Sequence, residues 1–285
     1  MPRKQVIVSA DDFGLSEGVN EAVERACCDG LLTTASLMVA GPATDDAIRR
    51  ARSLPKLRVG LHLVVVEGPA ASPAPGLLDA QGHFPSQQIG LSLDYFFRPG
   101  ARRALAAEIR AQFKAFAATG LRLDHANAHK HMHLHPTVGR LMLEAGAEHG
   151  LPAIRVPAES PAVMLACGAL PHLGDRLLYA GTRVLRAQAR RAGVRTNDYA
   201  FGIAWSGHMT AERVTRLAQE LPPGLNEIYF HPASYRDAQL KQLMPDYEHE
   251  AELAALLDPA VRTALARAGA ELTTYDAAWE TAGWN

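Results

Sequence analysis

The sequence predicts an α/β fold in one domain, built as a (β/α) barrel. Short apolar runs alternate with helical patterns along most of the 285 residues, which favours a parallel sheet covered by helices. At this length, and with 48% hydrophobic residues, the chain can bury one large core, and a barrel is favoured over an open doubly wound sheet. The residues that could carry chemistry stand at the ends of predicted strands, where the active sites of such barrels lie.

The first apolar run, residues 5–10, predicts a buried strand. Ser16 is a suitable N-cap and Gly30 a suitable stop, so we expect a helix over residues 17–29. Each later short apolar run is also expected to form a strand of the same sheet. These runs are residues 35–39, 58–63, 121–126, 154–156, 226–230 and 271–274.

Helical periodicity is clearest over residues 102–119, where apolar positions such as Leu105 and Ile109 recur at spacings of three and four. Pro136 suits the first turn of a helix, which we expect over residues 136–149. Further helices are expected over residues 45–53 and 210–221. The Pro- and Gly-rich residues 68–90 predict a long loop inside the domain, because the alternation resumes after them.

Composition argues against several classes of protein. The net charge of −1 gives no basic excess for binding nucleic acid, and no glycine-rich phosphate-binding motif occurs. The three cysteines, two of them adjacent, form neither a disulfide framework nor a Cys-x-x-Cys site, which indicates a reducing compartment. The early first strand and the absence of a long apolar run predict no signal peptide and no transmembrane helix. We therefore expect a cytoplasmic protein, which could still contact the inner face of a membrane.

Two adjacent carboxylates at the end of the first strand, Asp11 and Asp12, are the strongest indication of function. Such neighbours repel each other and are tolerated when a cation neutralises them, most commonly a metal ion. His62 ends a later strand, and five of the 12 histidines lie within residues 125–135. Aspartate with spaced histidines is a ligand set that suits zinc or another divalent metal in a hydrolase.

The histidines exceed what one metal site needs. On an extended chain His129, His131, His133 and His135 would face the same side, yet a catalytic site uses about three protein ligands and one open position. We expect the surplus to orient ligands or to contact substrate. His231 ends another strand, and Pro232 would hold it extended toward the pocket, where it could act as a general acid. The alternatives are a solvated Asp pair, a core histidine at position 62, a solvated histidine-rich loop and a structural His-Pro.

These motifs resemble those of the YdjC-like family of carbohydrate deacetylases, also called the ChbG/HpnK family. The resemblance spans residues 5–235 and is strongest for the branch of hopanoid-biosynthesis deacetylases. Four motifs carry it in the family's order. They are Ala10-Asp11-Asp12-Phe13-Gly14-Leu15-Ser16, Gly60-Leu61-His62, His129-Lys130-His131-Met132-His133 with Pro136, and Phe230-His231-Pro232.

The resemblance implies a distorted (β/α) barrel of the glycoside hydrolase/deacetylase type. Its implied activity is removal of an acetyl group from N-acetylglucosamine, carried by a hopanoid glycolipid. By motif position, the implied metal ligands are Asp12, His62 and His129, the general base is Asp11 and the general acid is His231. Zinc fits this ligand set best, and magnesium or another divalent ion is the alternative. Residues expected to contact substrate or to orient ligands are Asn127, His131, His133 and Arg155.

Asn127 departs from the family pattern, because many members have aspartate at this position. If that carboxylate adjusts the properties of a metal ligand or of the substrate site in those members, the effect differs here. Lys130 places a cation inside the histidine segment, and we expect its side chain to point away from the metal.

An apolar segment with interleaved arginines, at about residues 160–192, predicts an amphipathic helix that faces a lipid-linked substrate or a membrane. The alternative is an ordinary barrel helix with a solvated basic face. Two other functions stay open for the whole chain. One is deacetylation of soluble chito-oligosaccharides, and the other is metal or sugar binding without catalysis. The sequence makes no prediction about the oligomeric state.

Overall fold

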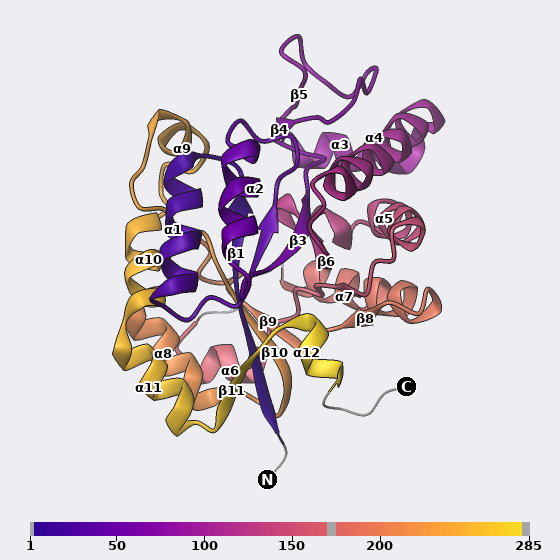
Figure 1. The fold of residues 1–285 in the computed structure, drawn as a ribbon. Helices are drawn as coiled ribbons and strands as arrows, with labels where there is room; N and C mark the ends of the chain where they lie inside the picture. Colours follow the sequence, from indigo (N-terminus) through magenta and orange to yellow (C-terminus); the bar gives the residue numbers. More distant parts are fainter. Residues whose placement is uncertain (1–2, 170–174, 281–285) are drawn as a thin grey trace.

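The computed structural model describes residues 3–169 and 175–280 and shows a curled parallel sheet with helices outside it (Figure 1). Among the described residues, nine strands form this sheet in the order β8-β7-β6-β3-β2-β1-β10-β9, with β11 paired to β1. The strands are β1 (Lys4–Phe13), β2 (Thr34–Leu37), β3 (Arg58–Leu63), β6 (Leu123–Ala128), β7 (Ala153–Ile154), β8 (Arg195–Thr196), β9 (Tyr199–Phe201), β10 (Gly224–Phe230) and β11 (Ala270–Thr273).

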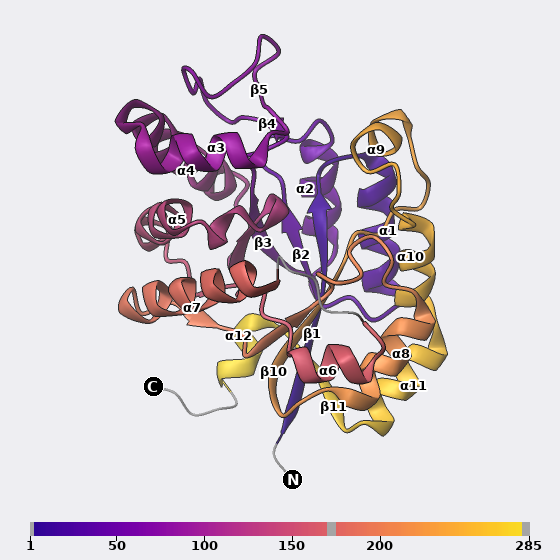
Figure 2. The same ribbon diagram turned by 180° about the vertical axis from the view of Figure 1, so that it is seen from behind.

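The helices connect successive strands. They are α1 (Glu17–Cys28), α2 (Thr44–Ser53), α3 (Gln88–Phe97), α4 (Pro99–Ala118), the 3₁₀ helix η1 (His129–Leu134), α5 (Pro136–Glu148), α6 (Pro161–Ala166), α7 (Asp175–Arg191), α8 (Ala211–Glu220), α9 (Ala238–Leu243), α10 (His249–Leu257), α11 (Pro259–Arg267) and α12 (Tyr275–Glu280). Figures 1 and 2 show α1, α8, α10 and α11 on one side of the sheet, and α3, α4, α5 and α7 on the other.

The sheet is an open barrel, which confirms the expected fold class. β8 and β9 are the two ends of the strand order, yet only Asn197 and Asp198 separate them in the chain, so the sheet must curl until its ends are neighbours. No ladder joins β8 to β9 in the described residues. Near this seam the Asn197 amide exchanges two hydrogen bonds, of 2.7 and 2.9 Å, with the backbone of Val156. The barrel is therefore distorted where its strands are shortest.

The buried strands explain the apolar runs of the sequence. In β1 the side chains of Val6, Ile7 and Val8 are all buried, because strands of a parallel sheet are covered on both faces. No helix in the described ranges has the length and apolar character needed to cross a membrane.

Several features differ from the sequence expectation, which included neither the strands β8 and β9 nor the helices α9, α10, α11 and α12. β1 continues past residue 10 through the Asp pair to Phe13. The loop expected at residues 68–90 contains a short antiparallel pair, β4 (Gly68–Pro69) with β5 (His83–Phe84), and its last residues begin α3. The sequence does not reveal α3 because this helix has apolar residues on both its buried and its exposed faces, which hides the helical periodicity.

Candidate metal centre and active site

A β-bulge in β1 brings Asp11 and Asp12 to the carboxyl edge of the barrel. The ladder with β2 pairs Ala10 and Phe13, which are three residues apart, with residues of β2 that are only two apart. Asp12 occupies the left-handed region with φ of 62°, an uncommon conformation for a residue other than glycine. The chain therefore bends at the Asp pair, which lets two adjacent aspartates face one pocket.

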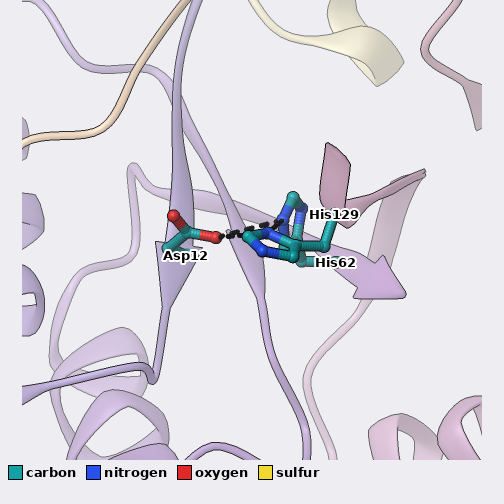
Figure 3. A group of neighbouring side chains, drawn as sticks. All are labelled: Asp12, His62 and His129. Carbon is teal, nitrogen blue, oxygen red and sulfur yellow. Dashed lines mark hydrogen bonds and ion pairs between the residues drawn. The ribbon is translucent and has the colours of Figure 1, made fainter. Parts of the chain in front are cut away.

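Asp12, His62 and His129 meet in one cluster, and their ligand atoms lie within 4.8 Å of one another (Figure 3). Asp12 Oδ1 is 3.2 Å from His62 Nε2 and 3.2 Å from His129 Nδ1. The two imidazole nitrogens are 3.4 Å apart. Asp12 and His62 lie at the carboxyl ends of β1 and β3, and His129 directly follows β6. These strands are close in the sheet, with only β2 between β1 and β3, so the sheet order brings the three residues together.

The donor atoms of this cluster fit a divalent cation. Both carboxylate oxygens of Asp12 are buried, and neither has a hydrogen-bond partner among the described residues, which is unusual for buried polar atoms. Oδ1 of Asp12, Nε2 of His62 and Nδ1 of His129 lie close enough together to act as separate ligands of one shared ion. One carboxylate oxygen and two imidazole nitrogens match the three protein ligands of catalytic zinc sites.

Asn127 connects a histidine of the cluster to the neighbouring aspartate. Its Oδ1 accepts a 2.7 Å hydrogen bond from Nδ1 of His62, which leaves Nε2 of His62 free to face the cluster. Its Nδ2 donates to Asp11 Oδ1 at 3.2 Å and to Ser36 Oγ at 2.9 Å. An aspartate here could not donate to Asp11, so the departure from the family pattern adds a bond to the expected base.

Arg155 lies fully buried between two carboxylates. It donates from Nη1 to Asp11 Oδ2 at 2.5 Å and from Nη2 to Glu227 Oε1 at 2.7 Å. Burial opposes the charged form of Asp11, but the Arg155 guanidinium and His62 hold the pKa of this carboxyl well below its usual range. Asp11 is therefore ionised at neutral pH.

The buried charges around the cluster also favour a divalent cation. Asp11, Asp12 and Glu227 carry three negative charges, and the guanidinium of Arg155 balances one of them. A cation of charge two at the cluster would neutralise the rest, which matters because unpaired buried charge is costly.

His131 and His133 lie apart from the metal cluster. Burial and the nearby Arg155 charge lower the pKa of His131 to about 3, and its Nε2 lies 3.0 Å from the Tyr229 hydroxyl. His133 donates from Nε2 to the Arg155 carbonyl oxygen at 3.0 Å. His133 therefore fixes the backbone that carries Arg155.

The histidine segment is not extended, so the shared face that an extended chain would give it does not form. Lys130 and His131 have φ of 50° and 54°, and the chain winds into the 3₁₀ helix η1. The winding sends alternate histidines to different neighbours, so they do not share one face. The Lys130 ammonium pairs with Glu67, in agreement with its expected direction away from the cluster.

His231 directly follows β10, and its side chain is largely buried. Its backbone N–H donates to Glu252 Oε2, and the other oxygen of Glu252 accepts from the Met209 N–H at 2.9 Å. The ring packs edge-on against Tyr229 and Tyr247, with centroids 5.7 and 5.1 Å away. Its charge also contributes to the low pKa of Asp11, so the expected acid and base lie in one electrostatic environment.

The fifth histidine of the segment, His125, belongs to the barrel core. It contacts Ser36 Oγ at 3.0 Å and stacks on Tyr275 at 4.8 Å between centroids. A Cβ at position 60 would lie 2.4 Å from the His125 ring, so this approach requires glycine in the Gly60-Leu61-His62 motif.

Sequence reasoning missed Glu227, Tyr229 and Glu252 as site residues. Glu227 and Tyr229 stand just before His231 on the same strand, which is the one available signal. Glu252 comes from α10 and has no signal in the sequence.

A groove of about 710 Å³ lies beside the site, between α3 and η1. Its walls include Leu93, Phe96 and Phe97 from α3, and Lys130 and His131 from η1. The α3 side of the groove is therefore apolar. His131 lines the groove and also lies near the charge of Arg155, so the groove borders the candidate site.

The segment of residues 160–192 is only partly described. Val163, Met164 and Leu185 are buried in the domain, whereas Leu165 and Val184 are exposed. Arg186 donates to the carbonyl oxygens of Asn197 and Asp198 at 2.7 and 2.5 Å, as an ordinary barrel helix would. Leu170 and Leu173 and the side chains of residues 175–178 lie outside the described part, so the membrane-facing role of the segment stays a prediction.

Comparisons with known proteins agree with this architecture. A carbohydrate deacetylase from Geobacillus stearothermophilus is 31% identical over 278 residues, covering 96% of this chain and 98% of that protein. One from Brevibacillus brevis is 36% identical over 154 residues, covering 54% of this chain and 59% of that protein. The crystal structure of an Enterococcus faecalis protein, named as a candidate for cellobiose-phosphate cleavage, has the same fold. Its TM-score is 0.76 at 23% identity, with 96% of this chain and 98% of that chain covered.

The YdjC-like protein family matches residues 5–267, which is most of the chain. That span contains the cluster residues Asp12, His62 and His129 as well as Asp11, Arg155 and His231. The chain therefore belongs to the YdjC-like protein family.

Proposed function

We propose that this protein is a metal-dependent N-deacetylase that hydrolyses the acetamide of an N-acetylated amino sugar. The observation that carries the proposal is the cluster of Asp12, His62 and His129 directly beside the ionised Asp11. His231 supplies a second proton-transfer group in the same environment. The carbohydrate deacetylases among the relatives support the same reaction class.

The cluster residues would hold one divalent cation, with zinc the best match, and the bound cation would polarise the acetyl carbonyl and make water more acidic. Asp11 accepts the proton of the attacking water. Arg155 binds Oδ2 of Asp11 and Asn127 binds Oδ1, so the orientation of this base is fixed before substrate arrives.

Water adds to the acetyl carbon, and the C–N bond must then break. An amine leaves poorly unless it is protonated, so His231 donates a proton to the nitrogen as the bond breaks. The products are acetate and a free amine. Glu252 holds the backbone of His231, and Tyr229 and Tyr247 hold its ring, which limits the positions the acid can take.

For the substrate we propose an amino sugar linked to a lipid, with the N-acetylglucosaminyl hopanoid implied by the sequence resemblance as the first case to test. The apolar groove between α3 and η1 supports this choice, because it offers a surface for an apolar group next to His131. A soluble chito-oligosaccharide has no lipid chain that could bind to that surface.

The test measures acetate release by the zinc-loaded protein from N-acetylglucosaminyl bacteriohopanetetrol and from diacetylchitobiose. Release from the lipid alone would support the full proposal, and release from the sugar alone would refute the lipid linkage. Absence of release from both, with bound metal confirmed, would favour a binding protein without catalysis. The Asp11→Asn variant controls for contaminating activity, and Asp45→Asn, on the surface of α2, is its matched control.

A further inference from the structure

An exposed apolar stripe runs along α3. Ile89, Leu93, Phe96 and Phe97 have exposed fractions of 79%, 55%, 49% and 71%. Their spacing of four, three and one residues places them on one side of the helix. A contiguous set of large apolar side chains in water marks a surface that contacts another partner.

The helix presents this stripe in a fixed orientation. On its opposite face Leu91 and Tyr95 are buried, and the Tyr95 hydroxyl donates to the Val65 carbonyl oxygen at 2.7 Å. The Phe96 ring packs edge-on against His135 with 5.4 Å between centroids, and it is tilted against the Phe97 ring at 5.3 Å. Rotating the helix to bury the stripe would expose Leu91 and Tyr95 and break this bond.

Arginines follow the stripe directly. Arg98 pairs with Asp94 at 3.2 Å, whereas Arg102 and Arg103, in the first turn of α4, are exposed. No carboxylate lies within ion-pair distance of Arg102 or Arg103 in the described part of the chain. Apolar and aromatic residues beside unpaired arginines are typical of helices that lie in the interface of an anionic bilayer.

The position of α3 relates this surface to the candidate active site. Figures 1 and 2 show α3 near the end of the molecule where the β4–β5 segment rises, and α6 toward the opposite end. The stripe residues line the groove between α3 and η1, together with Lys130 and His131. A flat apolar partner on the stripe would therefore lie at the mouth of the groove that borders the site.

We propose that α3 docks the protein on a lipid bilayer with anionic headgroups. Ile89, Leu93 and Phe97 enter the apolar boundary of the bilayer, while Arg102 and Arg103 contact headgroup phosphates. The docking itself is independent of the proposed activity. The delivery of a lipid-linked sugar from the bilayer into the groove rests on the proposed function.

The experiment is sedimentation of the full chain with vesicles of phosphatidylcholine, with and without phosphatidylglycerol, in the absence of any substrate. The wild type should bind the mixed vesicles more tightly, and added salt should weaken that binding. The double variant Ile89→Ser/Phe97→Ser should bind at least about tenfold more weakly, because two large apolar side chains are lost. The double variant Arg102→Gln/Arg103→Gln should bind the anionic vesicles about fivefold more weakly for each arginine replaced. Its binding to vesicles of phosphatidylcholine alone should not change.

The matched control is Leu272→Ser, which removes a partly exposed apolar side chain (38%) from β11, outside both α3 and the segment of residues 160–192. It should bind like the wild type, and thermal unfolding of each variant verifies the fold. The proposal is overturned if the wild type does not bind vesicles, or if Ile89→Ser/Phe97→Ser binds equally well. A wild-type dimer that this double variant dissociates, without vesicle binding, would assign the stripe to a second copy of the chain. Because no substrate is present, failure of the deacetylase proposal would leave the vesicle result unchanged.

Discussion

Replacing Glu227 with glutamine tests whether buried charge pairing holds the residues around the candidate base. Glu227 is fully buried and accepts hydrogen bonds from Arg155 at 2.7 Å, Ser9 at 2.7 Å and Tyr275 at 2.6 Å. Glutamine keeps the shape and can keep most of these bonds, so Glu227→Gln removes mainly the negative charge. Arg155 would then share its charge with Asp11 alone.

The expected loss in the free energy of unfolding follows from the burial of the ion pair between Arg155 and Glu227. Removing one partner of a buried ion pair costs about 3–5 kcal/mol. Arg155 keeps its second carboxylate, Asp11, so we expect the lower end, about 3 kcal/mol. The chain offers a matched control in Arg3 and Glu271, which also lie 2.7 Å apart but are 50% and 58% exposed. Glu271→Gln should cost about 0–1 kcal/mol, because water screens an exposed pair.

The assay is urea unfolding of the three proteins, compared by the free energy of unfolding at neutral pH. If Glu227→Gln costs no more than Glu271→Gln, the buried pair does not stabilise the fold and the reasoning is refuted. The pH dependence gives a second check. Burial opposes the charge of Glu227, but Arg155 lowers its pKa below the usual value, so its contribution is full above the unfolded-state pKa. That contribution is lost as the pH falls through the folded-state pKa. The difference in the free energy of unfolding between wild type and Glu227→Gln should therefore become smaller in acid.

Three further predictions concern the candidate metal centre. Asp11→Asn should retain the wild-type metal content, measured by elemental analysis, and lose at least about a hundredfold in turnover, and a near-normal rate would exclude Asp11 as the base. His129→Ala should lower the metal content, and unchanged stoichiometry would remove His129 from the ligand set. Asn127→Ala should weaken metal affinity about 10–100-fold in a chelator competition, because His62 loses the acceptor that orients it. Asn127→Asp should keep the affinity, because its carboxylate can still accept from His62, and should lose the bonds donated to Asp11 and Ser36. Equal affinity of wild type and Asn127→Ala would show that His62 is held by other contacts.

The sequence alone determined the barrel and the residue types at its carboxyl edge. Periodicity locates strand ends, and in a parallel barrel those ends converge, so local patterns are enough to place Asp11, Asp12, His62, His129 and His231 at one edge. The order of the family's motifs added the expected roles. The strand pattern and the motifs are local features of the sequence, and they do not depend on how the chain finally packs.

Only the tertiary structure decided the partners of these residues. The link from Arg155 to Glu227 and the contact of Glu252 with His231 join residues far apart in the sequence, and hydrophobic periodicity contains no information on such pairings. The histidine segment needed the structure as well, because left-handed backbone at Lys130 and His131 sends alternate side chains to different neighbours. The face of α3 that meets water was likewise undetermined, since a helix apolar on all sides shows which face is buried only when its packing partners are in place.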